Sequence, residues 1–520
     1  MTMSLSVPTM AAIRYGYGIR PGEPPARGAD DLLAQVQAGR TAAPLFPPEG
    51  IESRRKRIAE QRAWLDAYRK AVQNGTADRE RRKRFQQDRL KTFQTDAVAR
   101  IVGATMSPLG FNERLAGFWT NHFSVNAAKG LALWLMASLM EAEAIRPNMS
   151  GRFADLLQAV TLHPAMLIYL DQIRSVGPNS RAGKRNDRGL NENLARELME
   201  LHTLGVDGGY TQDDVRSAAL LLTGLGIKVP EQTTQFRPRR AEPGPFEILG
   251  KSYGKRRRSM ADCEALLDDL AANPHTARHI SRKLATHFID DAPPDDMVDA
   301  MVAAWQASDG TLIEVYRAML EHPRAWTEEG RKIKTPFEFI VSGLRALDVD
   351  DETLTAMIAV RGVDEAPSGP ASPAGDEMAG VDEDKATGEA AAVAGAPASG
   401  TGVMAKDNPA GTAAEKPDRQ ARRLTAQALA QMGQAAWRPP SPKGFADDAA
   451  AWLTASQLTA RIEWARKAVT VFGKDDDPRE FLRKVLADAA RDDTIQVVSQ
   501  APSKAYGMTL VLASPEFNRR

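Results

Sequence analysis

The segment NENLARELMELH, residues 191–202, gathers the residue types from which catalytic and metal-binding sites are built. It holds three glutamates, one arginine, two asparagines and one histidine among residues that otherwise favour a helix. At about 100° per residue, Asn193, Glu197 and Glu200 share one stripe of that helix, with Arg196 beside it. Two interpretations stay open. The stripe is either a solvated face held by ion pairs worth about 0.2–0.5 kcal/mol each, or one wall of a buried polar network.

Three features favour the network. Asn191 and Asn193 propagate an exposed helix poorly compared with lysine or glutamine. Asp171 ends the apolar run AMLIYLDQ, where the negative end of the helix disfavours a carboxylate by roughly 0.3–1 kcal/mol, so it needs an arginine or a bound cation. His122 lies in the aromatic stretch GFWTNHFSVN. A histidine there is usually a core residue, but with carboxylates close by it can be a ligand or a proton carrier.

We therefore predict that the stripe faces inward and that Arg196 holds one of the carboxylates. The candidate catalytic or metal-ligating residues are His122, Asp171, Glu197, Glu200 and His202, and the polar network comprises Asn191, Asn193, Arg196 and Asp214. A divalent metal is the cofactor that such a cluster could hold. The spacing assigns no catalytic role to any of these residues.

Other motifs are weaker. His275, His279 and His287 have helical spacing, but the glutamate of a zinc-binding HExxH pattern is missing, so structural histidines are the better interpretation. DGGYTQDD, from Asp207, lacks the ligand pattern of a calcium loop and is expected to be a turn followed by a helix cap at Thr211. The sequence has no Walker loop, GxGxxG or GxSxG motif. Cys263, surrounded by acidic residues, is a poor thiolate candidate.

The composition is that of a soluble globular protein: 520 residues, 43% hydrophobic and 26% charged. The net charge of +1 provides no global field for nucleic acid or an anionic membrane. The single cysteine permits no intramolecular disulfide, and no run of eighteen apolar residues predicts a membrane span. The first residues lack the pattern of a secretory signal peptide, so a cytoplasmic location is expected. The alternative is the periplasm, or export together with a partner that carries a twin-arginine signal.

Apolar periodicity predicts a mainly α fold: a large multi-helix globular domain with a small irregular or β-hairpin insertion over 235–255. We expect an N-terminal arm (1–50), a helical main domain (51–362), a disordered low-complexity insertion (363–418), and a C-terminal helical part (419–520) that packs on the main domain. The insertion lacks aromatic and most large aliphatic residues, so it cannot bury enough apolar surface to fold, and its deletion should not affect folding. Residues 51–90 predict one strongly charged amphipathic helix, followed by another over 93–105. The basic run RERRKRFQQDRLK, from Arg79, is interpreted as a solvated face, with a nucleic-acid patch as the alternative.

Several stretches resemble one bacterial family, catalogued as domain of unknown function 1800. They are IRYGYGIRPGE, FWTNHFSV, AMLIYLDQ, the block from NENLARELMELH to LLLTGLGI, KIKTPFEFIVSGLRAL, MGQAAWRPPSPKGFADDAAAWLTASQLTAR and LASPEFNRR. The matching positions include Trp119, His122, Asp171, Asn191, Asn193, Arg196, Glu197, Glu200, His202, Gly205, Tyr210, Thr211, Asp214, Thr223 and Gly224. The chain departs from the family pattern in a basic segment over 174–188 and in the long 363–418 insertion.

The resemblance implies a helical protein without a settled activity. It also implies a partner from a second family, domain of unknown function 1501, which looks like the sulfatase and alkaline-phosphatase superfamily. Two functions follow as expectations. The first is a binding or accessory protein that works with the sulfatase-like partner. The alternative is a metal-dependent hydrolase that uses the Asp/Glu/His cluster.

Overall fold

The computed structural model describes residues 5–185, 189–228, 231–327, 332–358, 417–473 and 476–520. The fold is mainly α, as predicted, with two small antiparallel hairpins. The predicted disordered insertion over 363–418 falls almost entirely outside the described residues. Within the described ranges, no helix is both long enough and apolar enough to cross a membrane.

The first half of the chain forms short helices around two long ones. They are α1 (Val7–Met10), α2 (Ala29–Gly39), α3 (Ile51–Gln73), α4 (Arg79–Met106), α5 (Gly110–His122), α6 (Leu133–Met140), α7 (Phe153–Thr161), α8 (Pro164–Tyr169), α9 (Asn193–Glu197) and α10 (Gln212–Leu222). Three helices continue directly into wider π turns, at Ala11–Tyr15, Glu141–Ile145 and Leu198–His202.

The second half begins with the hairpins. Strand β1 (Leu225–Lys228) pairs with β2 (Thr233–Phe236), and β3 (Phe246–Ile248) pairs with β4 (Lys251–Tyr253). The helices that follow are α11 (Met260–Ala272), α12 (Pro274–Phe288), α13 (Asp295–Ala307), α14 (Leu312–Glu321), α15 (Pro336–Ala346), α16 (Asp351–Ile358), α17 (Pro417–Leu424), α18 (Ala426–Gln431), α19 (Ala455–Phe472), α20 (Pro478–Leu486), α21 (Asp492–Ser499), α22 (Lys504–Ala513) and α23 (Pro515–Asn518). The expected hairpin over 235–255 is present as β3–β4, and a second hairpin precedes it.

One hydrophobic core joins the two halves, and it runs from Tyr15 to Phe517. Helix α19 packs on α15, where Trp464 meets Phe339 with ring centroids 5.3 Å apart. Gly343 makes this approach possible, because a Cβ atom there would lie 2.4 Å from the Trp464 ring. The C-terminal helices therefore complete the core of the preceding helices.

The prediction of one helix over 51–90 is wrong. Helix α3 ends at Gln73 and α4 starts at Arg79, so the predicted helix over 93–105 is the continuation of α4. The chain reverses at Gly75, which adopts the left-handed region with φ of 72°. Asp78 then caps α4 by accepting the backbone N–H of Arg81 at 3.0 Å. The charged pattern continues across the turn, so periodicity could not locate the break.

The basic segment after Arg174 is held by hydrogen bonds in its described part. The backbone N–H groups of Gly177 and Ala182 donate to the carbonyls of Arg240 and Arg239, at 2.9 and 3.0 Å. The Glu242 carboxylate accepts the backbone N–H of Asn179 at 2.8 Å. These bonds fix the segment against the loop between β2 and β3.

Candidate functional site

The predicted helix over 191–202 divides its polar residues between two environments. Its last turn is the π turn Leu198–His202, which buries His202 to 1% exposure while Glu197 and Glu200 stay half-buried. Burial, and after it the charge of Glu200, raises the pKa of Glu197. Glu200 lies beside Tyr210, a partly buried phenol whose pKa is raised by burial and by this carboxylate. The glutamate stripe therefore neighbours tyrosines rather than histidines.

The predicted polar-network residues lie at the start of this helix and of α10. Asn193 is exposed, and Asn191 accepts its backbone N–H at 2.9 Å. Arg196 contacts Glu192 at 3.3 Å and Gln212 at 3.0 Å, at the protein surface. Asp214 forms a capping box with Thr211 and accepts the backbone N–H of Leu249 at 2.7 Å. These contacts cap helices and link neighbouring elements.

Asp171 has the compensating cation that its position requires, and the cation is Lys129. The Lys129 ammonium lies 2.7 Å from the Asp171 carboxylate and also donates to the Tyr169 carbonyl. Arg174 is a second, more distant partner at 3.6 Å. Asp171 itself is in the left-handed region, with φ of 57°, where the chain leaves α8.

The structure brings His122 and His202 together in a buried cluster with His279 and Lys283. The ring centroid of His122 lies 6.1 Å from that of His202 and 6.5 Å from that of His279. The Lys283 ammonium donates to Nδ1 of His122 at 2.9 Å. Nε2 of His122 lies 3.3 Å from the His202 carbonyl, an acceptor, so this nitrogen carries the proton. His122 is therefore a neutral ring with both nitrogens occupied.

Electrostatics agrees with this assignment. Burial, followed by the charge of Lys283, lowers the pKa of His122 well below 6.5 and that of His202 to about 3. Burial also lowers the pKa of Lys283 to about 8. The cluster is thus one ammonium surrounded by neutral imidazoles.

This arrangement does not fit a divalent metal. A histidine ligand presents a free lone pair, but the lone pair of His122 accepts a hydrogen bond from the Lys283 ammonium. The carboxylates that were expected to complete the cluster lie with Lys129 or beside tyrosines. In the described part of the chain, no three His, Cys, Asp or Glu side chains are grouped to hold a metal ion.

The cluster predicts acid lability. Below pH 6.5 the unfolded chain protonates His122 and His202, whereas the folded protein keeps both neutral. Their contribution to stability is therefore complete above pH 6.5 and is lost as the pH falls. On going from pH 7 to pH 5, each of these two histidines should lower the free energy of unfolding by about 2 kcal/mol, because about 1.4 kcal/mol is lost per pH unit below pH 6.5. Urea unfolding at the two pH values measures the loss, and His202→Gln should reduce it. Equal stability at pH 7 and pH 5 would contradict the buried neutral assignment.

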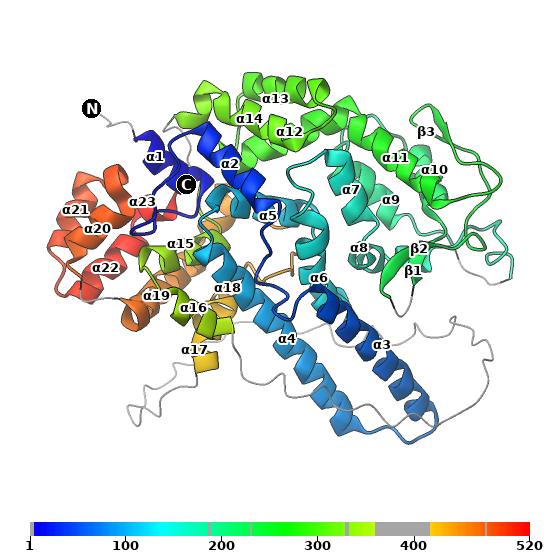
Figure 1. Ribbon diagram of the computed structural model, residues 1–520, viewed down its shortest axis with the longest axis horizontal. Helices are drawn as coiled ribbons and strands as arrows, with labels where there is room; N and C mark the ends of the chain where they lie inside the picture. The colour runs from blue at the N-terminus through cyan, green and yellow to red at the C-terminus, as the bar shows by residue number, and fades with distance from the viewer. Residues whose placement is uncertain (1–4, 186–188, 229–230, 328–331, 359–416, 474–475) are drawn as a thin grey trace.

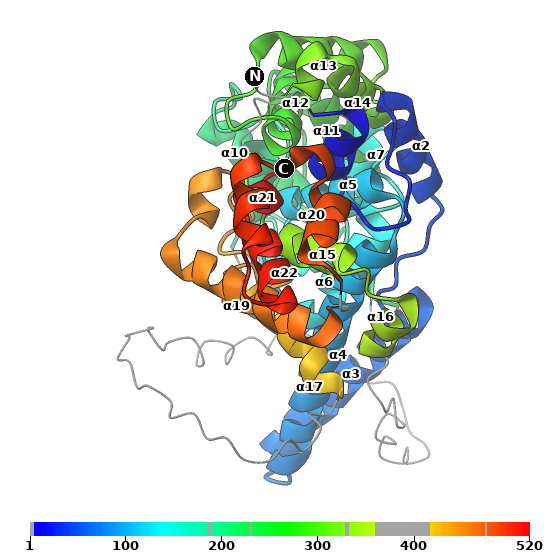
Figure 2. The same cartoon turned by 90° about the vertical axis from the view of Figure 1, so that its left-hand side faces the viewer.

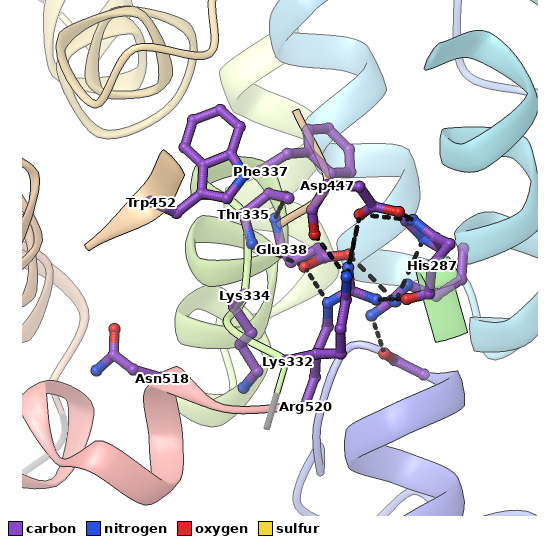
Figure 3. A network of polar contacts seen from close by, with 12 residues as sticks. His287, Lys332, Lys334, Thr335, Phe337, Glu338, Asp447, Trp452, Asn518 and Arg520 are labelled. Carbon is purple, nitrogen blue, oxygen red and sulfur yellow. Dashed lines mark hydrogen bonds and ion pairs between the residues drawn. The ribbon is translucent and has the colours of Figure 1, made fainter. Parts of the chain in front are cut away.

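A second cluster, the ionic network of Figure 3, includes His287 of α12, which lies one helical turn after Lys283. Glu338 on α15 contacts Arg114 at 3.2 Å and Arg520 at 3.0 Å. Arg520 also contacts Asp447 at 3.2 Å, and Asp447 contacts the His287 ring at 2.9 Å. The charges of His287 and Arg520 hold the pKa of Asp447 well below its usual range, against its burial.

The network joins five separate parts of the chain: α5, α12, α15, the loop before Trp452, and the chain end after α23. Lys332 adds a further link, because its ammonium contacts Asp291 and the Asp447 carbonyl at 2.5 Å each. The Glu338 carboxylate also accepts the Thr335 backbone N–H at 2.8 Å and so caps its own helix. Contacts of this kind hold separate elements of the fold together.

Among the residues that the structure describes, two small cavities stand out. One, of about 50 Å³, is lined by residues that include Arg100, Thr120, Asn121, Gln434 and Trp437, and the other, of about 40 Å³, lies beside Tyr17 and Gly110. Each has room for a few water molecules, whereas ligand sites typically enclose about 300–1,000 Å³. Neither cavity encloses the volume of a typical small-molecule site. Cys263 is fully buried, and burial raises its thiol pKa to about 12, so it is inert.

The most distinctive surface feature is the pair of long helices α3 and α4. Both views show their joined ends extending away from all other labelled elements (Figures 1 and 2). We call residues 51–91 the helical hairpin and residues 69–84 the hairpin tip. Trp64 of α3 stacks on Phe85 of α4 with ring centroids 4.0 Å apart, which fastens the two helices together near the tip. At the base, buried Arg54 of α3 and Asp96 of α4 form an ion pair that joins the two helices, and Arg54 also donates to the Ser138 hydroxyl of α6 at 3.1 Å.

The hairpin tip is strongly basic. It contains seven basic and two acidic residues. Lys70, Arg79, Lys83 and Arg84 are exposed, and within the described chain they have no ion-pair partner. Val72 exposes 52% of its surface beside them. Sequence reasoning identified the basic run but placed it within one continuous helix, so it missed the projecting tip.

The chain belongs to the family described as "Protein of unknown function (DUF1800)", whose model matches residues 10–519. The resemblance read from the sequence motifs is therefore confirmed. No curated protein and no solved structure matches the chain.

Proposed function

We propose that this protein is a helical binding or accessory protein for a sulfatase-like partner of family 1501, and that it docks the partner through the hairpin tip. The observation that carries the proposal is the concentration of exposed, unpaired cations at the end of a projecting hairpin. A cytoplasmic location, with export alongside a twin-arginine partner as the alternative, is part of the same proposal.

The geometry of the hairpin suits protein recognition. Helix α4 has 28 residues and is therefore about 42 Å long, so its basic end is presented well away from the body. Arginine is enriched at protein interfaces, and the tip combines exposed arginines with exposed Val72. A patch of one charge steers association with a surface of the opposite charge. The partner surface is therefore acidic.

The interior offers less support for an enzyme. Both ring nitrogens of His122 are occupied, one by Lys283 and the other by the His202 carbonyl, and the two cavities described above are smaller than typical ligand sites. The ionic network around Glu338 links structural elements. These observations favour the binding function over the hydrolase alternative.

Charge reversal at the tip tests the proposal. The triple variant Arg79→Glu, Lys83→Glu, Arg84→Glu should bind a purified family 1501 protein about 10–100-fold more weakly than the wild type, because like charges then face each other. Isothermal titration at about 50 mM salt measures the dissociation constant. The control variant Arg466→Glu, Lys467→Glu, Lys484→Glu has the same charge change on the exposed faces of α19 and α20 and should bind normally.

Three results would overturn the docking surface. The first is equal binding by the tip variant and the wild type. The second is equal weakening in the control variant, which would show that only total charge matters. The third is tighter binding of the wild type to a DNA duplex than to the protein, with the tip variant losing both, which would make the tip a nucleic-acid patch.

A further inference from the structure

The two ends of the 359–416 segment meet the chain beside the helical hairpin. Helix α16, which precedes the segment, packs on α4, and α17, which follows it, contacts both α4 and α16. Figure 2 shows α16 and α17 next to the α4 helix. The segment itself lies outside the described residues, but its attachment points are fixed on the helix that carries the basic tip.

The charges of the hairpin and of this segment are opposite. The helical hairpin, residues 51–91, contains fourteen basic and six acidic residues. Residues 364–389 contain eight acidic residues and one lysine, Lys385. The chain as a whole is nearly neutral, but its charges are unevenly distributed, with excess cations in the hairpin and excess carboxylates in the segment.

The connection is long enough to join them. Asp376 lies eighteen positions after Ile358, which corresponds to roughly 60 Å of extended chain. That exceeds the length of α4, about 42 Å. A tethered segment of this kind has an effective concentration on the order of millimolar at its target. Individual exposed ion pairs are worth about 0.2–1 kcal/mol each. Several of them together would keep the segment on the tip for most of the time and still let a partner replace it.

We propose that the acidic segment 364–389 of this chain docks on its own hairpin tip and occupies it until an acidic partner displaces it. This inference rests on the proposed function, because it concerns regulation of the same docking surface. It assigns the insertion a role as an internal competitor. Partner binding should then depend on how well the partner's acidic surface outcompetes the segment.

Zero-length cross-linking of the full chain without any partner tests the contact directly. A carbodiimide joins a carboxylate to a lysine amine only when the two groups touch. Lys70 and Lys83 should form links to carboxylates of 364–389. The yield of these links should be about tenfold or more above the yield of links from Lys251 to the same carboxylates. Lys251 is an exposed lysine on β4 whose ammonium lies 2.5 Å from Asp269, so its link to Asp269 is the internal positive control.

Two further comparisons establish the electrostatic cause. At about 1 M NaCl, charges are screened beyond about 3 Å. The yield of links from Lys70 and Lys83 to the segment should then fall to the yield from Lys251 to the segment. The variant Arg79→Gln, Arg82→Gln, Arg84→Gln keeps both lysines but should lose most of the links, whereas Arg466→Gln, Arg483→Gln should keep them.

The proposal is overturned if Lys70 and Lys83 link to the segment no more than Lys251 does, while the control link between Lys251 and Asp269 still forms. It is also overturned if mixing isotopically labelled and unlabelled chains yields mostly mixed links, because the occupant would then be a second copy. Both results are obtained without the partner, so they are independent of whether the partner binds the tip.

Discussion

Asp96→Ala should lower the free energy of unfolding by about 3–5 kcal/mol. Asp96 and Arg54 are both fully buried, and their nearest ion-pair atoms lie 2.5 Å apart at the base of the helical hairpin. The Ser138 hydroxyl also donates to Asp96, at 2.6 Å. Removing the carboxylate leaves the Arg54 guanidinium buried with only part of its charge offset by Glu49. Urea unfolding followed by circular dichroism measures the loss.

The double variant Arg54→Met, Asp96→Leu removes both charges, whereas Asp96→Ala leaves a buried charge without its partner. Replacing both charges by apolar side chains is often neutral, so this variant should recover most of the stability. If Asp96→Ala costs less than about 1 kcal/mol, the value typical of an exposed pair, the ion pair does not anchor the hairpin.

Glu338→Ala should have a comparable effect, about 3–5 kcal/mol, because it leaves a buried group of cations without its central anion. Arg114 and Arg520 both contact this carboxylate. Glu338 also offsets the desolvation that lowers the pKa of buried Lys334 to about 7. In the variant these buried cations repel one another with little screening by solvent. Urea unfolding measures the resulting loss of unfolding free energy.

The matched control is Glu321→Ala on α14. Glu321 pairs with Arg317 at 3.6 Å, but its side chain is 58% exposed, so its loss should cost less than about 1 kcal/mol. Similar losses for Glu338→Ala and Glu321→Ala would show that the ionic network contributes no more than a surface pair.

Local features of the fold could be predicted because their causes are local. Apolar periodicity located most of the helices, and Thr211 and Asp214 form the expected capping box. The Thr335–Glu338 capping box is equally local and could have been found by the same signature. Helix α22, with a glycine at position 507, lacks a strong charged face, and its stability comes from packing on α19 and α20.

The candidate site was less predictable because it depends on long-range contacts. His122, His202 and Lys283 are far apart in sequence, and only the folded chain shows that a lysine rather than a carboxylate completes the histidine cluster. Likewise, a helix-end argument predicted that Asp171 needs a cation, but could not identify Lys129. The basic run from Arg79 was correctly expected to face solvent, but its position at the end of a projecting hairpin depends on a single turn at Gly75.

The most direct test of the binding function is hydrogen exchange of the full chain with and without the family 1501 protein. We expect bound partner to slow amide exchange across the hairpin tip and its neighbouring turns, residues 59–90, while the helices around Glu338 exchange as in the free protein. Protection confined to the body of the molecule, with the hairpin unchanged, would contradict it.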